Sequence, residues 1–95
     1  MQRVTVEEER RFVPLLVQLE APLAEAAIDV PTATSLVRWV LANSTDYWCD
    51  LALAWVEQGV DAHAVQSELT ALADAGRNRP QALRHRAKRL IPKVP

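Results

Sequence analysis

The sequence predicts an all-α protein: a compact bundle of four to five short helices, with a basic helix at the C-terminus. Only two glycines occur in 95 residues, which is few for a β protein with its many tight turns. Apolar residues recur at helical spacing, whereas runs of Val, Ile, Thr and aromatic residues are sparse. Prolines, glycines and capping residues divide the chain into helix-length segments. From its length we expect residues 1–95 to form a single helical domain.

The first predicted helix begins at Thr5. Thr5 and Glu8 have the spacing of a capping box, and the glutamates of this first turn suit the positive end of a helix dipole. Pro14 and Pro22 follow within the same apolar pattern. Each proline removes a backbone donor and clashes with the preceding turn, so we expect this helix to kink or to break into shorter pieces.

Two further helices are expected in the middle of the chain. The second follows a break at residues 30–32 and runs to about Ala42. A cluster of capping residues then ends the second helix and starts the third. The third runs from about Thr45 to Gln58 and stops at Gly59, which suits the left-handed conformation after a helix. Because it is apolar around most of its circumference, we expect it to be the central helix.

The aromatic residues separate candidates for the core from candidates for contact. Trp48 and Trp55 lie seven residues apart on one face of the third helix, so we expect both in the core. Trp39 lies at the edge of the apolar stripe of its helix, and Tyr47 lies toward the polar side. Both are expected to be partly exposed and are candidate protein contacts. The narrow charged stripe of the third helix is a further candidate: Asp46, Asp50 and Glu57.

The fourth and fifth helices are predicted from the capping and helix-breaking residues at their ends. Asp61 is a good N-cap for the fourth helix, and Gly76 closes it. Pro80 suits the first turn of the fifth helix, which ends at about Leu90 or Ile91. The fifth helix keeps a thin apolar seam among its charged residues: Leu83, Ala87, Leu90 and Ile91.

Charge divides the chain more sharply than any other property. All twelve acids lie at or before Asp74, together with four arginines, whereas seven cations and no acid follow it. The net charge of −1 therefore combines an acidic helical body (1–76) with a basic helix and tail (77–95). Such asymmetry indicates a charged partner. The candidate residues for binding a protein or a phosphate group are Arg77, Arg79, Arg84, Arg86, Lys88 and Arg89.

No combination of residues indicates catalysis, a metal or a cofactor. No spacing brings Cys49 together with either histidine, and nothing around Cys49 predicts an activated thiol. The chain has too few Cys and His residues for a zinc site. Asp46 and Asp50 lie one turn apart and repel each other. They can hold a weak Mg²⁺ or Ca²⁺ site or, as we expect, accept an arginine from the tail or from a partner. We therefore expect a protein that is not an enzyme and has no cofactor.

The sequence also favours a cytoplasmic location. No apolar stretch approaches the length that spans a bilayer, and the acidic N-terminal region has the wrong sign for a signal peptide. The single cysteine cannot form an internal disulfide, which fits a reducing compartment. Nine arginines against two lysines favour a GC-rich bacterial source.

These observations leave three hypotheses of function, and an enzyme ranks last because no catalytic combination of residues is identified. The first is a small protein-interaction module (an adaptor, an inhibitor or immunity-type protein, or a regulatory protein) whose bipolar charge steers it to another protein or to a second copy of itself. The second is nucleic-acid binding through the basic C-terminal helix, as part of a helix-turn-helix. That helix lacks the usual Asn, Gln and Ser set for base edges, and its apolar seam favours docking on a protein surface, either that of its own body or that of another protein. It has no aromatic anchor for a membrane surface.

Overall fold

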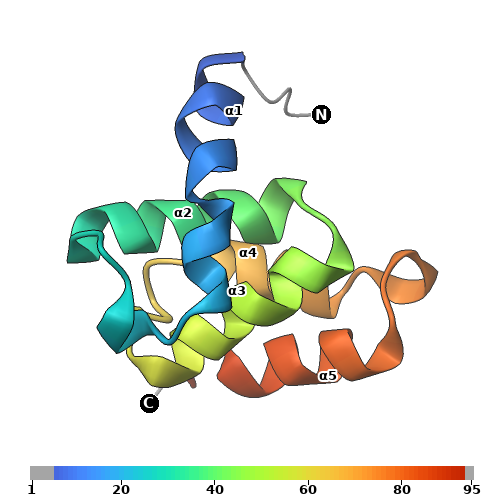
Figure 1. The fold of residues 1–95 in the computed structure, drawn as a ribbon. Helices are drawn as coiled ribbons and strands as arrows, with labels where there is room; N and C mark the ends of the chain where they lie inside the picture. Colours follow the sequence, from blue (N-terminus) through green and yellow to red (C-terminus); the bar gives the residue numbers. More distant parts are fainter. Residues whose placement is uncertain (1–5, 94–95) are drawn as a thin grey trace.

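The computed structural model describes residues 6–93. Over this range the chain is all-helical, with no strand, which confirms the predicted fold class (Figure 1). Its Cα radius of gyration is 12.6 Å, so the helices form a compact globule. In chain order the elements are α1 (Val6–Phe12), the 3₁₀ segments η1 (Val13–Glu20) and η2 (Leu23–Glu25), α2 (Val30–Asn43), α3 (Asp46–Gln58), α4 (Gln66–Ala73), the 3₁₀ turn η3 (Gly76–Asn78) and α5 (Gln81–Leu90).

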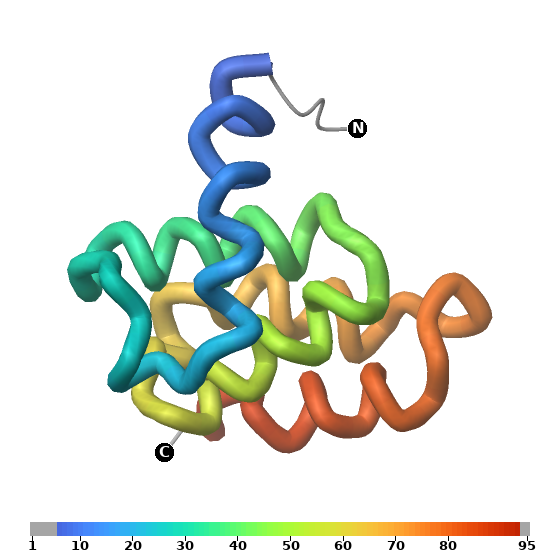
Figure 2. The backbone as a smooth tube through the Cα atoms, in the orientation of Figure 1, coloured from blue at the N-terminus to red at the C-terminus, as the bar shows by residue number. Residues whose placement is uncertain are grey.

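Helix α3 lies at the centre of this arrangement, as the sequence predicted. It packs against α2, α5 and η1, while α4 pairs with both α5 and α2. Cys49, Leu53 and Trp55 of α3 are each 0% exposed. By contrast, α1 rises away from the body formed by α2 to α5, and η1 leads from it across that body (Figures 1 and 2).

The prolines break the first helix as expected. The backbone changes from α-helix to 3₁₀ geometry at Val13, directly before Pro14, and it becomes extended at Ala21, directly before Pro22. A 3₁₀ segment of eight residues is long for this geometry, and side-chain contacts with the body support it. The predicted cap at Thr5 lies outside the described residues.

Two aromatic contacts attach α1 and η1 to the body. The ring of Phe12 stacks on Trp39 of α2, with centroids 5.5 Å apart and an interplanar angle of 25°. Farther along, the indole Nε1 of Trp55 donates a hydrogen bond of 2.9 Å to the carbonyl oxygen of Ala21. Leu19 is 2% exposed and adds an apolar contact between them. Trp55 is therefore a core residue whose polar atom is satisfied.

The ends of α2 and α3 lie close to the predicted capping residues, and the structure shows one further cap. Asp29, which was not among the predicted caps, caps α2, because its Oδ1 accepts the N–H of Thr32 at 3.2 Å. Thr45 occupies the N-cap position of α3, although its side chain makes no capping bond. Gly59 ends α3 with a φ of 139°, where a side chain would be strained.

The prediction for the fourth helix was wrong in its limits. Asp61 does not cap α4; its carboxylate accepts the N–H of His63 at 2.9 Å and stabilises a turn instead. The α-helix begins only at Gln66 and ends at Ala73. Gly76 lies beyond this end, in η3, with a φ of 60°. The backbone between Asp61 and Gln66 makes i→i+3 hydrogen bonds, from Ala64 N to Asp61 O and from Gln66 N to His63 O, so a tighter turn precedes the α-helix.

The extent to which the three tryptophans are buried differs from the prediction. Trp55 is fully buried and Trp48 is partly buried against the core, with an edge contact of 4.9 Å to Tyr47. Tyr47 is 57% exposed, as expected. Trp39, however, is only 8% exposed, because Phe12 covers it, so the expectation of a partly exposed indole was wrong. Its Nε1 has no hydrogen-bond acceptor among the described residues.

The unpartnered indole of Trp39 gives a prediction for stability. Trp39→Ala is expected to lower the free energy of unfolding by about 3–5 kcal/mol, as for other buried aromatic truncations. Trp39→Phe keeps a ring against Phe12 and removes the unbonded donor, whose burial costs about 1–3 kcal/mol. We therefore expect the Phe variant to lie within about 1.5 kcal/mol of the parent in urea unfolding. A Phe variant as unstable as the Ala variant would show that the indole N–H is bonded in solution.

Candidate interaction surface

The basic segment is attached to the body by two arginines. The first is Arg79, between η3 and α5. Its Nη1 lies 2.6 Å from Oδ1 of Asp46, and its Nη2 donates a 2.9 Å hydrogen bond to the carbonyl oxygen of Ser44. The planar guanidinium thus bridges a side chain and a backbone group at the start of α3, a geometry that lysine cannot reproduce. Because the Arg79 side chain is only 19% exposed, this bridge also fixes the turn before α5.

The second attachment is Arg86, in the middle of α5. Its Nη1 lies 2.5 Å from Oδ1 of Asp50, and its Nη2 lies 2.5 Å from Oε1 of Glu57. A third bond joins Nη1 to the carbonyl oxygen of Asp50 at 3.2 Å. One guanidinium therefore joins two carboxylates seven residues apart on α3, and beside it Leu83 and Ala87 are buried. We call this set of contacts the Arg86 clamp.

The charged stripe of α3 therefore receives its cations from the same chain. Asp46 pairs with Arg79, while Asp50 and Glu57 pair with Arg86. The expectation that the two aspartates accept an arginine from the tail is confirmed. In residues 6–93, no group of three or more Asp, Glu, His or Cys side chains is placed to hold a metal ion.

These ion pairs change the acid–base properties of their members. The hydrogen bond from Arg86 lowers the pKa of Glu57, and it correspondingly raises the pKa of Arg86. The hydrogen bond to Asp46 raises the pKa of Arg79. Burial raises the pKa of the Cys49 thiol, whose Sγ donates to the carbonyl oxygen of Val40 at 3.4 Å. Such a thiol stays protonated at neutral pH and is a poor nucleophile.

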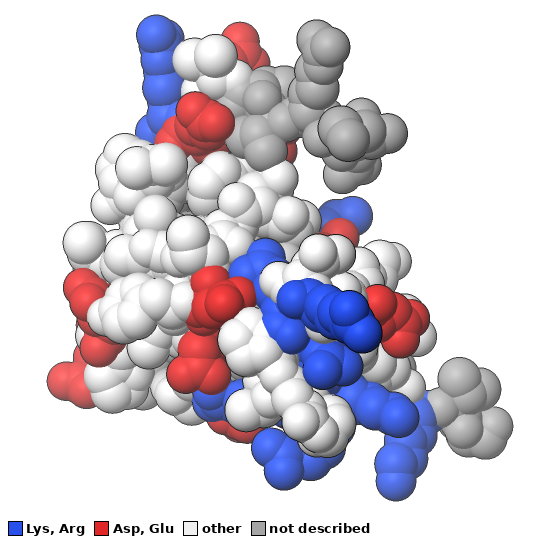
Figure 3. Space-filling model, turned by 90° about the vertical axis from the view of Figure 1, so that its right-hand side faces the viewer, with Lys and Arg blue, Asp and Glu red and all other residues white. Residues whose placement is uncertain are grey.

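Among the described residues, the other cations of the basic segment are not bonded to the stripe, although the charge of Arg89 helps to lower the pKa of Glu57. No ion pair within the described residues involves them, although the Nε of Arg84 donates to the carbonyl oxygen of Arg79 at 3.1 Å. Figure 3 shows Lys and Arg side chains gathered in a patch over the lower half of one face, with carboxylates beside it. We define the outer basic face as Arg77, Arg84, Lys88, Arg89 and Lys93.

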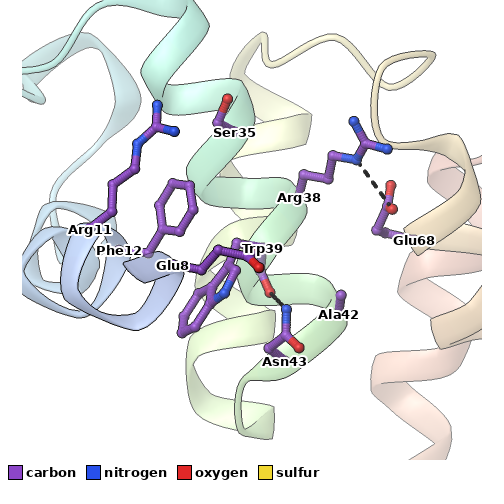
Figure 4. A pocket seen from close by; sticks show the side chains of 9 residues that line it. All are labelled: Glu8, Arg11, Phe12, Ser35, Arg38, Trp39, Ala42, Asn43 and Glu68. Carbon is purple, nitrogen blue, oxygen red and sulfur yellow. Dashed lines mark hydrogen bonds and ion pairs between the residues drawn. The ribbon is translucent and has the colours of Figure 1, made fainter. Parts of the chain in front are cut away.

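A shallow hollow of about 350 Å³ lies on another part of the molecule, between α1, α2 and α4. Figure 4 shows Arg11 and Arg38 on either side of Ser35, and Arg38 bonded to Glu68 with an Nε–Oε2 distance of 3.3 Å. Stacked aromatic rings form one wall, and Glu8 also lines the hollow. Its arginines and glutamates balance in charge. Its described lining includes no His or Cys, and no hydrogen bond between described residues joins Ser35 to Glu68 there.

None of the helices in residues 6–93 combines the length and the hydrophobicity needed to cross a membrane.

Comparison of the chain with protein-family models, with curated proteins and with solved structures found no match.

The Arg86 clamp gives a prediction for stability and its pH dependence. We expect Arg86→Gln to cost about 1 kcal/mol, because charge-assisted bonds are strong but these carboxylates are about half exposed. The corresponding fall in Tm is about 4–8 °C for a domain of this size. Glu57 has a lowered pKa in the folded state, so its contribution is present above the unfolded value of about 4.3 and is lost as pH falls through the folded value.

Thermal unfolding of the parent protein and of Arg86→Gln between pH 7 and pH 3 checks the predicted pH dependence. The difference in Tm between parent and Arg86→Gln should be largest near pH 7 and should shrink as the pH falls below about 4. Lys88→Gln removes the same charge from an exposed and unpaired position of the same helix, so it should change stability by less than about 0.5 kcal/mol. Equal destabilisation by both variants would contradict the clamp.

Proposed function

We propose that this chain is a small non-enzymatic protein-interaction module, of the adaptor, inhibitor or immunity-type, or regulatory kind. Its contact surface is the outer basic face, and its partner is an acidic protein surface. The observation that carries the proposal is the division of the basic segment into two sets. Arg79 and Arg86 bond to the body, whereas the outer basic face has no ion pair within the described residues.

Rigid attachment makes this face suitable for recognition. The buried side chains of Leu83 and Ala87, together with the Arg86 clamp, hold α5 in one orientation. A helix that is already ordered loses little conformational entropy on binding, so more of its interaction energy appears as affinity. A patch of one sign also accelerates encounter with a surface of the opposite sign and makes the association rate sensitive to salt.

The apolar seam of α5 docks on the chain's own body and therefore does not distinguish a protein partner from nucleic acid. Leu83 and Ala87 are occupied by contacts with the chain's own body, so the part that a partner meets is almost entirely charged and polar. Nucleic-acid binding by the same cations is the second candidate function. With five phosphate contacts, binding to duplex DNA would weaken with salt along a slope of about −4.5.

The test compares two charge-matched double variants of the full chain. Lys88→Gln/Arg89→Gln changes the outer basic face, and Arg11→Gln/Arg38→Gln removes two charges from the exposed hollow near α1. Each protein is immobilised, and bound proteins from a host lysate are quantified. A genuine partner should be acidic, and the first variant should recover it about tenfold less well, the equivalent of roughly 1.4 kcal/mol, while the second retains it.

A duplex DNA of mixed sequence is titrated in parallel at several salt concentrations. Tight binding with a salt slope near −4.5, lost in Lys88→Gln/Arg89→Gln, would favour the nucleic-acid function. Recovery of the same proteins by both variants, with no DNA binding, would overturn the assignment of the outer basic face as a contact surface.

A further inference from the structure

The outward face of α1 has a pattern that the proposed function does not use. Val6, Glu9, Arg10 and Val13 follow one another at the spacing i, i+3, i+4 and i+7, which places them on one side of a helix. The backbone remains helical at Phe12, with φ −96° and ψ −33°, so Val13 continues this side. Val6 is 61% exposed and Val13 is 51% exposed. We call these four residues the α1 outer face.

The body does not cover this face. Phe12 is the one buried residue of α1, and the side of the helix that lines the hollow carries Glu8 and Arg11. No ion pair within the described residues involves Glu9 or Arg10. A helix of seven residues is marginal by itself in water, and helices in proteins gain most of their stability from packing an apolar face.

We propose that a second copy of this chain packs on the α1 outer face, with the two α1 helices antiparallel. A two-fold axis between positions 9 and 10 would bring Glu9 of each copy to Arg10 of the other and Val6 of each copy to Val13 of the other. The order apolar, acidic, basic, apolar is complementary to itself when reversed, as an isologous interface requires. An unrelated partner would give no reason for this palindromic order.

The contact is small, and this sets the expected affinity. A pair of two-turn helices buries far less than the roughly 1,200–2,000 Å² of a stable interface. The dimer is therefore expected to form at high protein concentration and to dissociate on dilution. It involves no residue of α5, so its failure would leave the proposed function untouched.

Charge exchange tests the pairing. Glu9→Arg places arginine at both central positions, and Arg10→Glu places glutamate at both, so each variant alone would bring like charges together in the dimer. An equimolar mixture of the two restores both opposite-charge pairs. Glu and Arg are both good helix formers, so the substitutions should leave α1 helical. Arg11→Glu, on the side that lines the hollow, is the control with the same charge change as Arg10→Glu.

The readout is the mass from analytical ultracentrifugation of the full chain at concentrations up to about 1 mM, the range in which weak dimers form. The parent and Arg11→Glu should approach the dimer mass, each single variant should dimerise at least tenfold more weakly, and the mixture should recover the dimer. A parent that stays monomeric throughout would overturn the proposal. So would single variants that dimerise like the parent, a mixture that remains monomeric, or an Arg11→Glu variant that fails as Arg10→Glu does.

Discussion

The docking of α5 on α3 determines which surfaces this protein can present. Leu83 and Ala87 are buried in the core, and burial of a leucine side chain contributes about 1.5–3 kcal/mol. The Arg86 clamp contributes less energy, because ion pairs near the surface are worth little. Its contribution is geometric: a guanidinium that bonds to both Asp50 and Glu57 fixes the rotation of α5 about its own axis and its position along α3.

The same contacts reduce the repulsion between the carboxylates of α3. Asp46, Asp50 and Glu57 lie along one side of that helix, where like charges one turn apart repel. Arg79 and Arg86, from the neighbouring segment, offset two of these three negative charges, and the charge of Arg89 also acts on Glu57. The acidic stripe is consequently part of the intramolecular structure, which disfavours an association in which the tail of one copy binds the stripe of another. The cations of the outer basic face form no ion pair with this stripe among the described residues.

The sequence alone predicted the parts of this arrangement that depend on periodicity. The central position of α3 followed from its wide apolar circumference, and the break near Pro14 followed from proline geometry. The burial of Trp39 was not predictable in this way, because it depends on Phe12, which reaches it from a separate segment. The late start of α4 was missed because residues 61–66 form i→i+3 backbone hydrogen bonds before the α-helix begins, and the pattern of apolar residues does not distinguish these from α-helical bonds. The clamp could be anticipated as a charge pairing, but the choice of Arg86 over its basic neighbours required the register of α5 on α3.

Because α1 and α5 lie on opposite sides of the body, the two proposed surfaces can be used at the same time. In Figure 1, α1 rises from one side of the body and α5 lies along the opposite side. A contact between two copies through the α1 outer face would therefore leave both outer basic faces open. Two identical basic faces on one particle can engage an acidic partner that repeats or is itself dimeric, and the second contact then forms at a high effective concentration. A weak self-association would in that way increase apparent affinity for a repeating partner without any change in the outer basic face itself.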